Sequence, residues 1–313
     1  MVSPQAPRLV LGAAQIGQPY GRSGRPAPSE QEVRELLRLA AASGCAAIDT
    51  ARAYGDSEGT LGRARSGGAG AELPVVTKIR PLTDHDGAAG LRAAVKESLA
   101  ASLTALHADR VDTVLLHRGA DLSRAGGAAI EALRSARDRG LLTRWGVSVG
   151  APDELLAALA VPDLGYVQLP FNLLDRRWLA GPVRAALAAR PDVTVVARSA
   201  FLQGILLRPD PSTWPVGAGP DADVVRTSLT ALAGEWGRTI AGLCLGYVLG
   251  QPRVDAVVVG IRSAAQLADV ARECAAPPLT ADECDHVTGR LPAGSPTLVD
   301  PARWTALSRE TSA

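Results

Sequence analysis

The sequence lacks an excess of charge of one sign and has no long apolar run. Of its 313 residues, 33 are Lys or Arg and 32 are Asp or Glu, so the formal net charge is +1. Nucleic acids and anionic membrane surfaces attract proteins of strongly positive charge, and we therefore expect neither as a partner. No apolar run reaches the roughly 18 residues that a spanning helix needs, and the start lacks the pattern of a signal peptide. These absences favour a globular cytoplasmic protein that acts on a small molecule.

Three motif types are also absent. The four cysteines are far apart and no pair has CxxC spacing, which argues against a disulfide framework and against a structural zinc site. The histidines at 85, 107 and 286 do not cluster with carboxylates at strand ends, so we expect no metal and disfavour a metal-dependent lyase or isomerase. No Gly-x-Gly-x-x-Gly follows the first apolar segment, which disfavours an open sheet that binds a dinucleotide.

Lysine and aromatic residues are scarce, which makes each one more informative. Only Lys78 and Lys96 are lysine, so the other 31 of the 33 basic residues are arginine, and there are 2 Phe, 4 Tyr and 5 Trp. Because arginine serves here wherever a generic positive charge suffices, a retained lysine suggests a specific chemical role.

Short apolar segments rich in β-branched residues recur down the whole chain. We expect eight strands, at residues 8–13, 46–51, 74–79, 113–118, 144–149, 166–171, 193–199 and 256–261. Segments with helical spacing separate them, and the first of these begins at a Ser29–Glu32 capping box and stops at Gly44. Other helical segments are 87–106, 125–140, 151–160, 180–190, 221–236 and 240–250.

This alternation predicts the fold. Near-continuous apolar strands that alternate with helices indicate a parallel sheet, and eight such units in roughly 250 residues are typical of a closed (β/α)8 TIM barrel of the α/β class. We expect one domain over residues 1–313, with a long surface loop at 200–225. The tail, residues 277–313, reads as irregular and is expected near a barrel mouth.

Polar residues interrupt the apolar strands almost only at their downstream ends. They are Asp49, Lys78, His117, Ser148, Gln168, Arg198 and Arg262. In a barrel these ends converge on the face where active sites lie, so residues scattered over the chain become neighbours. A charged group that ends a buried strand must be desolvated or paired, which perturbs its titration. We therefore predict an active site at this face.

Three of these residues, together with Tyr54, suggest a proton donor beside an oxyanion site. The phenol of Tyr54, with an ordinary pKa of about 10, donates a proton poorly at neutral pH unless a cation such as Lys78 lies against it. Asp49 would keep the ammonium charged, and a neutral His117 could donate a hydrogen bond to a substrate oxygen. The structural alternatives are a buried Asp49–Lys78 salt bridge, a core tyrosine and a satisfied histidine.

Four motifs make the chain similar to bacterial aldo-keto reductases over roughly residues 8–275. They are IDTARAYGDSE, VVTKI, VDTVLLHR and YVQLPFNLLDRR, in this order. The resemblance implies an NADPH-dependent oxidoreductase that reduces an aldehyde or ketone by direct hydride transfer. It also implies a catalytic tetrad of Asp49, Tyr54, Lys78 and His117, with Tyr54 as general acid. The alternative is a regulatory subunit that binds NADPH on the same barrel and turns over little, similar to the β subunits of potassium channels.

The same resemblance assigns the cofactor site. Ser148 and Gln168 match the positions that bind the nicotinamide carboxamide, and Arg262 could face a 2′-phosphate, which favours NADPH over NADH. The segments after the seventh and eighth strands would hold the rest of the cofactor through Ser199, Phe201, Gln203, Gly204, Gly260, Arg262, Gln266 and Asp269. Arg198 replaces the family's aromatic residue that stacks on nicotinamide, and its charge disfavours the oxidised cofactor.

The substrate is weakly encoded. Candidate pocket-rim residues are Ile16, Tyr20, Trp214 and Trp304. This mixture suits the carbonyl of a sugar, a cyclitol or another small molecule, and Arg198 leaves room for an anionic substrate such as a sugar nucleotide. The composition resembles that of high-GC bacteria, which suggests specialised metabolism by analogy. The true substrate, the direction of reaction and the oligomeric state stay open.

Overall fold

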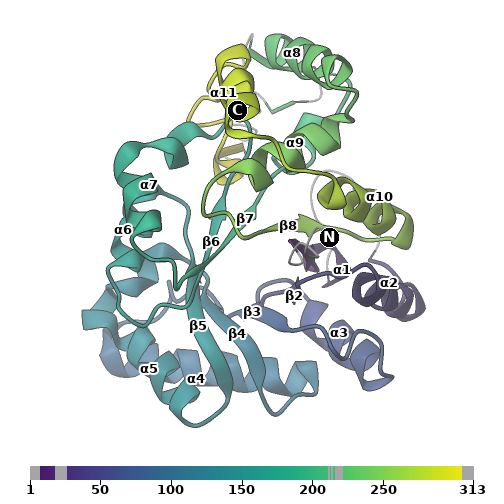
Figure 1. Ribbon diagram of the computed structural model, residues 1–313. Helices are drawn as coiled ribbons and strands as arrows, with labels where there is room; N and C mark the ends of the chain where they lie inside the picture. The colour runs from purple at the N-terminus through teal and green to yellow at the C-terminus, as the bar shows by residue number, and fades with distance from the viewer. Residues whose placement is uncertain (1–7, 18–26, 211, 213, 216–220, 305–313) are drawn as a thin grey trace, which may run out of the picture.

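Eight parallel strands close into a barrel that helices surround (Figure 1). The computed structural model describes residues 8–17, 27–210, 212, 214–215 and 221–304. The strands are β1 (Leu9–Gly12), β2 (Ala47–Asp49), β3 (Val75–Lys78), β4 (Val111–Leu116), β5 (Leu142–Ser148), β6 (Tyr166–Pro170), β7 (Thr194–Arg198) and β8 (Ala256–Gly260). β1 pairs with β2 and also with β8, in the register Leu9 to Val257, which closes the sheet. The predicted TIM barrel and all eight strands are confirmed.

Helices connect successive strands, and local sequence signals set their ends. They are α1 (Ala14–Gly17), α2 (Glu30–Ala42), α3 (Ser57–Ser66), α4 (Gly87–Leu106), α5 (Ala128–Asp138), α6 (Pro152–Leu159), α7 (Gly181–Ala188), α8 (Asp221–Glu235), α9 (Ile240–Gly250), α10 (Ala264–Ala275) and α11 (Ala281–Arg290). The capping box of α2 forms as predicted, because the Ser29 hydroxyl accepts from the Glu32 N–H and the Glu32 carboxylate accepts from the Ser29 N–H. None of the described helices is long and apolar enough to cross a bilayer.

One alternation rule places the polar residues of the strands inside the barrel. The barrel interior holds a small apolar cluster of Val10, Ala47, Val76, Leu115, Tyr166, Val196 and Ala256. Alternate residues of a strand point to the same side, so the residue two positions downstream also faces the interior. Those downstream residues on β2, β3, β4, β6 and β7 are Asp49, Lys78, His117, Gln168 and Arg198. The interior therefore changes from apolar to polar toward its carboxyl end.

The tail differs from its sequence interpretation. The expectation of an irregular tail is wrong over α11, which begins at a second capping box formed by Thr280 and Glu283. Beyond α11, the Gly294 N–H donates to the Leu174 carbonyl at 2.9 Å. Because Leu174 follows the carboxyl end of β6, this hydrogen bond brings the tail to the same end of the barrel as the strand-end polar residues.

Candidate active site

The four predicted catalytic residues come from separate elements and meet at the carboxyl end of the barrel. Asp49 ends β2, Lys78 ends β3, His117 follows β4, and Tyr54 lies in the turn between β2 and α3. The Nζ atom of Lys78 lies 2.7 Å from the Asp49 carboxylate and 4.9 Å from the centre of the Tyr54 ring. The rings of Tyr54 and His117 meet edge to face, with their centres 6.0 Å apart.

Lys78 is a buried cation with a complete set of partners. Its side chain is 1% exposed, and its Nζ donates to Asp49 Oδ1 and, at 2.9 Å, to the Thr50 carbonyl. Burial by itself lowers the pKa of Lys78, but the Asp49 carboxylate and the Tyr54 hydroxyl outweigh it, so the pKa lies above its usual value. Lys78 therefore stays positively charged at neutral pH beside the phenol of Tyr54.

His117 is neutral at physiological pH. Burial lowers the pKa of its imidazole most, and the positive charges of Lys78, Arg198 and Arg118 also lower it, whereas a hydrogen bond with the Ile79 backbone raises it. Together these effects bring the pKa to about 4. A neutral imidazole has one ring N–H to donate and one nitrogen that accepts. His117 can therefore donate a hydrogen bond to an uncharged carbonyl oxygen without supplying a full positive charge.

The turn that carries Tyr54 is fixed by buried polar contacts. The Thr50 hydroxyl donates to the Ser57 hydroxyl, which donates to the Ala13 carbonyl, both at 2.9 Å. Gly17 lies against this turn so closely that a Cβ there would come within 2.1 Å of the Tyr54 carbonyl oxygen. Only glycine fits at position 17, because any side chain would collide with the backbone of the turn. These contacts hold Tyr54 in the site.

Glu58, from the motif IDTARAYGDSE, also holds the turn that carries Tyr54. Glu58 is buried and accepts a hydrogen bond from the Thr77 hydroxyl at 2.6 Å, and it also pairs with Arg52. Thr77 precedes Lys78 on β3, so Glu58 joins the turn to the strand that carries the predicted catalytic amine. Sequence reasoning missed this role, because Thr77 lies 19 positions from Glu58 and outside the motif IDTARAYGDSE.

The match to known proteins agrees with this geometry. The model of the Aldo/keto reductase family matches residues 8–290. This chain belongs to the aldo/keto reductase family. Relatives named aldo-keto reductase occur in Mycobacterium marinum, 30% identical over 270 residues and 85% of each chain, and in Mycobacterium ulcerans, 31% identical over 251 residues and 79% of each chain. The predicted family resemblance is confirmed, and membership implies nicotinamide-dependent carbonyl reduction.

A solved structure supports the fold. An aldo-keto reductase from Bacillus halodurans, in a holo form, superposes with a TM-score of 0.72 over 94% of this chain and 95% of that one. The sequences are 23% identical, so this likeness concerns the arrangement of the barrel and not the substrate. Within the described residues of this aldo-keto reductase, no group of three His, Cys, Asp or Glu side chains is placed to hold a metal ion.

The two residues predicted to bind the carboxamide lie side by side on β5 and β6. Ser148 pairs in register with Gln168, and both are buried at the polar end of the interior. The Nε2 of Gln168 donates to Asp49 Oδ2 at 2.7 Å, a contact that sequence reasoning missed. Gln168 therefore also supports the Asp49–Lys78 pair, which no local pattern could reveal because 119 positions separate Gln168 from Asp49.

The segment after β7 has an unusual backbone. Ser199, Gln203 and Gly204 have φ values of +62°, +54° and +84°, in the left-handed region that favours glycine. Asn172, from the loop after β6, donates to the Ser199 carbonyl at 3.4 Å. Non-glycine residues held in this region cluster at binding sites. The strain therefore fits the predicted pyrophosphate-binding role of this segment, in which Phe201 is half-buried and Gln203 is exposed.

Arg262 lies directly before the N-terminus of α10. The Ser263 hydroxyl caps this helix by accepting from the Gln266 N–H, and the Gln266 side chain accepts from the Arg262 N–H at 3.2 Å. An arginine next to a helix N-terminus is a combination that suits phosphate. These residues fit the adenosine end of a nicotinamide dinucleotide. Asp269 is exposed and forms an ion pair with Arg272. Gly260 ends β8, and a Cβ added there would lie 3.3 Å from the Gln15 side chain.

Arg198 lies beside the tetrad. It ends β7, its Nη2 donates to the Val149 carbonyl at 3.2 Å, and its charge contributes to the lowered pKa of His117. The guanidinium therefore adds positive charge to a site that already contains Lys78.

The predicted substrate residues present little surface. Ile16, Trp214 and Trp304 are at most 8% exposed and belong to the main apolar core, and the Trp304 indole N–H donates to the Thr297 carbonyl. Tyr20 lies outside the described residues. Contact of these four with a substrate stays a prediction.

Proposed function

We propose that this aldo-keto reductase uses NADPH to reduce an aldehyde or ketone to an alcohol, with Tyr54 as the proton donor. The observation that carries the proposal is the position of Tyr54 between a charged Lys78 and a neutral His117. These neighbours supply the two properties that a phenol needs as a general acid, a cation beside it and a donor that orients the acceptor oxygen.

Each member of the tetrad has a distinct task. Reduced nicotinamide, when bound, supplies a hydride to the carbonyl carbon. Tyr54 donates its proton to the carbonyl oxygen, and Lys78 stabilises the negative charge left on the phenol oxygen. His117 donates a hydrogen bond to that carbonyl oxygen and orients it. Asp49 keeps Lys78 charged and in place, with Gln168 holding the second carboxylate oxygen.

The choice of cofactor rests on Arg262. Its position at the start of α10 supports recognition of a phosphate, which NADPH carries on the adenosine ribose and NADH lacks. Ser148, Gln168 and the segment from Ser199 to Gly204 would bind the rest of the cofactor. The positive charge of Arg198 would weaken the hold on the oxidised form, which favours reduction as the working direction.

The substrate is proposed only by class. A sugar or cyclitol carbonyl, a sugar nucleotide, or another small aldehyde or ketone suits a site in which the cations Lys78 and Arg198 lie near the proton donor. A cytoplasmic location and a role in specialised metabolism stay predictions.

The Tyr54→Phe variant tests the proposal, because it removes only the hydroxyl and keeps the ring that packs on His117. Turnover, followed by the loss of NADPH absorbance with a panel of carbonyl compounds, should fall by about 100-fold or more. Titration of the same variant should show an unchanged Kd for NADPH, and the parent enzyme should bind NADPH more tightly than NADH. Tyr247→Phe is the matched control and should keep full activity.

Two results would count against the proposal. Turnover by Tyr54→Phe at the parent rate would remove Tyr54 as the acid. A parent protein that binds NADPH tightly but turns over no carbonyl in the panel would favour the regulatory subunit instead.

A further inference from the structure

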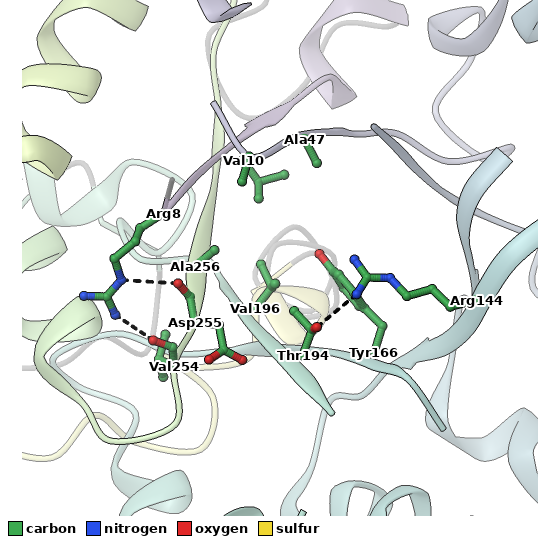
Figure 2. Close-up of a pocket in the computed structure, with 11 residues that line it drawn as sticks. Arg8, Val10, Ala47, Arg144, Tyr166, Thr194, Val196, Val254, Asp255 and Ala256 are labelled. Carbon is green, nitrogen blue, oxygen red and sulfur yellow. Dashed lines mark hydrogen bonds between the residues drawn. The ribbon is translucent and has the colours of Figure 1, made fainter. Parts of the chain in front are cut away.

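A cavity of about 440 Å³ opens at the amino-terminal end of the barrel, opposite the active site (Figure 2). Its walls come from residues near the starts of the strands, among them Val10, Arg144, Tyr166 and Thr194. The tetrad lies at the strand ends instead, so the two sites do not share residues. This volume is in the range of small-molecule sites.

The cavity exists because small side chains leave space in the barrel interior near the starts of the strands. The usual interior of such a barrel is packed by layers of bulky branched side chains. Here two of the interior positions, on β2 and β8, are Ala47 and Ala256, and both line the cavity. Tyr166 is the one aromatic member of the interior cluster, and its ring forms part of the wall.

The hydroxyl of Tyr166 has no hydrogen-bond partner among the described residues, although the residue is only 2% exposed. A buried hydroxyl without a partner destabilises a fold by about 1–3 kcal/mol, and phenylalanine would fill the same space without that cost. Figure 2 shows the ring extending from β6 toward the middle of the cavity. Burial raises the pKa of Tyr166, so the hydroxyl keeps its proton and remains a donor. This group is therefore ready to donate to a ligand.

Arg144 brings a positive charge to the same place. Its Nη1 donates to the Thr194 hydroxyl at 3.0 Å (Figure 2). Its Nε donates to the Thr113 hydroxyl at 2.8 Å, and its guanidinium lies 5.1 Å from the centre of the Tyr166 ring. None of the described carboxylates lies within 4.0 Å of this guanidinium. The hydroxyls therefore orient the charge of Arg144 but do not neutralise it.

The other charged groups leave the cavity with a net positive charge. Arg8 donates to the carbonyls of Leu249 and Val254, at 2.7 and 2.6 Å. Asp255 is the one carboxylate in the lining, and its Oδ2 accepts from the Val195 N–H while its Oδ1 lies 3.6 Å from Arg253. This acid already has a donor and a cation of its own, whereas both arginines of the lining bond only to neutral oxygens.

We propose that this cavity binds a small organic anion, a carboxylate or phosphate monoester on a compact apolar body. Arg144 and the Tyr166 hydroxyl would contact the anionic group, and the apolar side chains of Val10 and Val196 would contact the body. A bidentate guanidinium and a neutral hydroxyl are the donors that such oxygens favour. The proposal does not depend on the reaction at the opposite end of the barrel.

Binding of phenyl phosphate, measured by calorimetry on the NADPH-saturated full chain, tests this site. Saturation with NADPH keeps the probe away from the groups that would bind the cofactor's phosphates. If NADPH does not bind, the parent protein and its variants are compared without nucleotide. Benzyl alcohol and benzamidine are matched neutral and cationic probes. We expect phenyl phosphate to bind saturably and the other two at least about tenfold more weakly, since hydrogen bonds to a charged group are the stronger ones.

Three variants locate the site. Arg144→Met should weaken phenyl phosphate binding by about tenfold or more, and Tyr166→Phe by about fivefold. Tyr166→Phe should also unfold at the same or a higher temperature, because it removes an unpaired polar group, and this keeps the test valid if Arg144→Met folds poorly. Arg38→Met, an exposed arginine on α2, is the control and should leave binding unchanged.

Three outcomes would overturn the proposal. One is no saturable binding of phenyl phosphate to the parent protein. Another is equal binding by the parent, Arg144→Met and Tyr166→Phe, which would place the anion elsewhere. The third is tighter binding of benzamidine than of phenyl phosphate, which would mean that Asp255 sets the charge preference.

Discussion

At the scale of single residues, the imidazole of His117 shows how burial and charge decide chemistry. Its pKa is lowered to about 4, first by burial and then by the charges of Lys78, Arg198 and Arg118. In the unfolded chain the same group would titrate near 6.5. Between these two pH values the unfolded chain binds a proton that the folded protein does not. Folding stability contributed by this group is therefore complete above about pH 6.5 and falls as the pH drops toward 4.

The His117→Gln variant should remove that pH dependence. We expect the parent protein to lose up to about 3 kcal/mol more stability than the variant between pH 6.5 and pH 4. Urea unfolding of both proteins over a pH series measures the difference, and contributions from carboxylates cancel because both proteins share them. Parallel stability curves for the two proteins would contradict the assigned charge state of His117.

At the scale of elements, the ends of helices follow local side-chain hydrogen bonds. The same Ser or Thr followed three residues later by Glu begins both α2 and α11. The first box was predictable from its spacing, whereas the second follows a pair of prolines in a segment that reads as irregular. The Thr280 side chain nevertheless accepts from the Glu283 N–H, and this contact sets the start of α11.

The Thr280→Ala variant should lower the free energy of unfolding by about 1 kcal/mol, the usual cost of losing an N-cap. Chemical denaturation measures the change. Thr230→Ala in α8 is the matched control, because the Thr230 hydroxyl only donates back to the Arg226 carbonyl within its own helix. Stability of the control should stay the same or rise slightly, and an equal loss in both variants would argue against the cap.

At the scale of the whole molecule, closure of the barrel depends on how near the strands can approach each other. β5 and β6 pair with Gly146 opposite Tyr166. A Cβ on Gly146 would come within 2.1 Å of the Tyr166 carbonyl oxygen, which is backbone and cannot move aside alone. The absence of a side chain at this position therefore lets the two strands meet and lets the Tyr166 ring occupy the interior.

The Gly146→Ala variant should destabilise the barrel by at least about 2 kcal/mol, because the two strands must move apart. Thermal unfolding followed by circular dichroism measures this loss. Gly90→Ala in α4 makes the same chemical change where nothing lies within 4 Å of the added Cβ, and it should raise stability by up to about 1 kcal/mol. A Gly146→Ala protein as stable as the parent would show that strand spacing is not limited here.

Most of the architecture and the composition of the tetrad were predictable from the sequence. Strand and helix periods are local, so eight strands and a parallel barrel follow from apolar patterns without knowledge of any contact. The positions of Asp49, Lys78 and His117 at strand ends are likewise local facts, and the geometry of a barrel is enough to bring them to one face. The expected helices did not include α3, α10 or α11. At α11 the composition of the segment outweighed a local capping signal.

Contacts between distant residues and the position of the cavity were not predictable from the sequence. The contact of Gln168 with Asp49, the burial of Ile16 and Trp214, and the cavity around Tyr166 each depend on residues that lie far apart in the chain. The amino-acid sequence by itself determined the barrel and the family, because periodicity and motifs need only neighbouring positions. Only the tertiary structure decided which polar group meets which and where space is left, because packing depends on the sum of side-chain volumes that distant strands bring to one point.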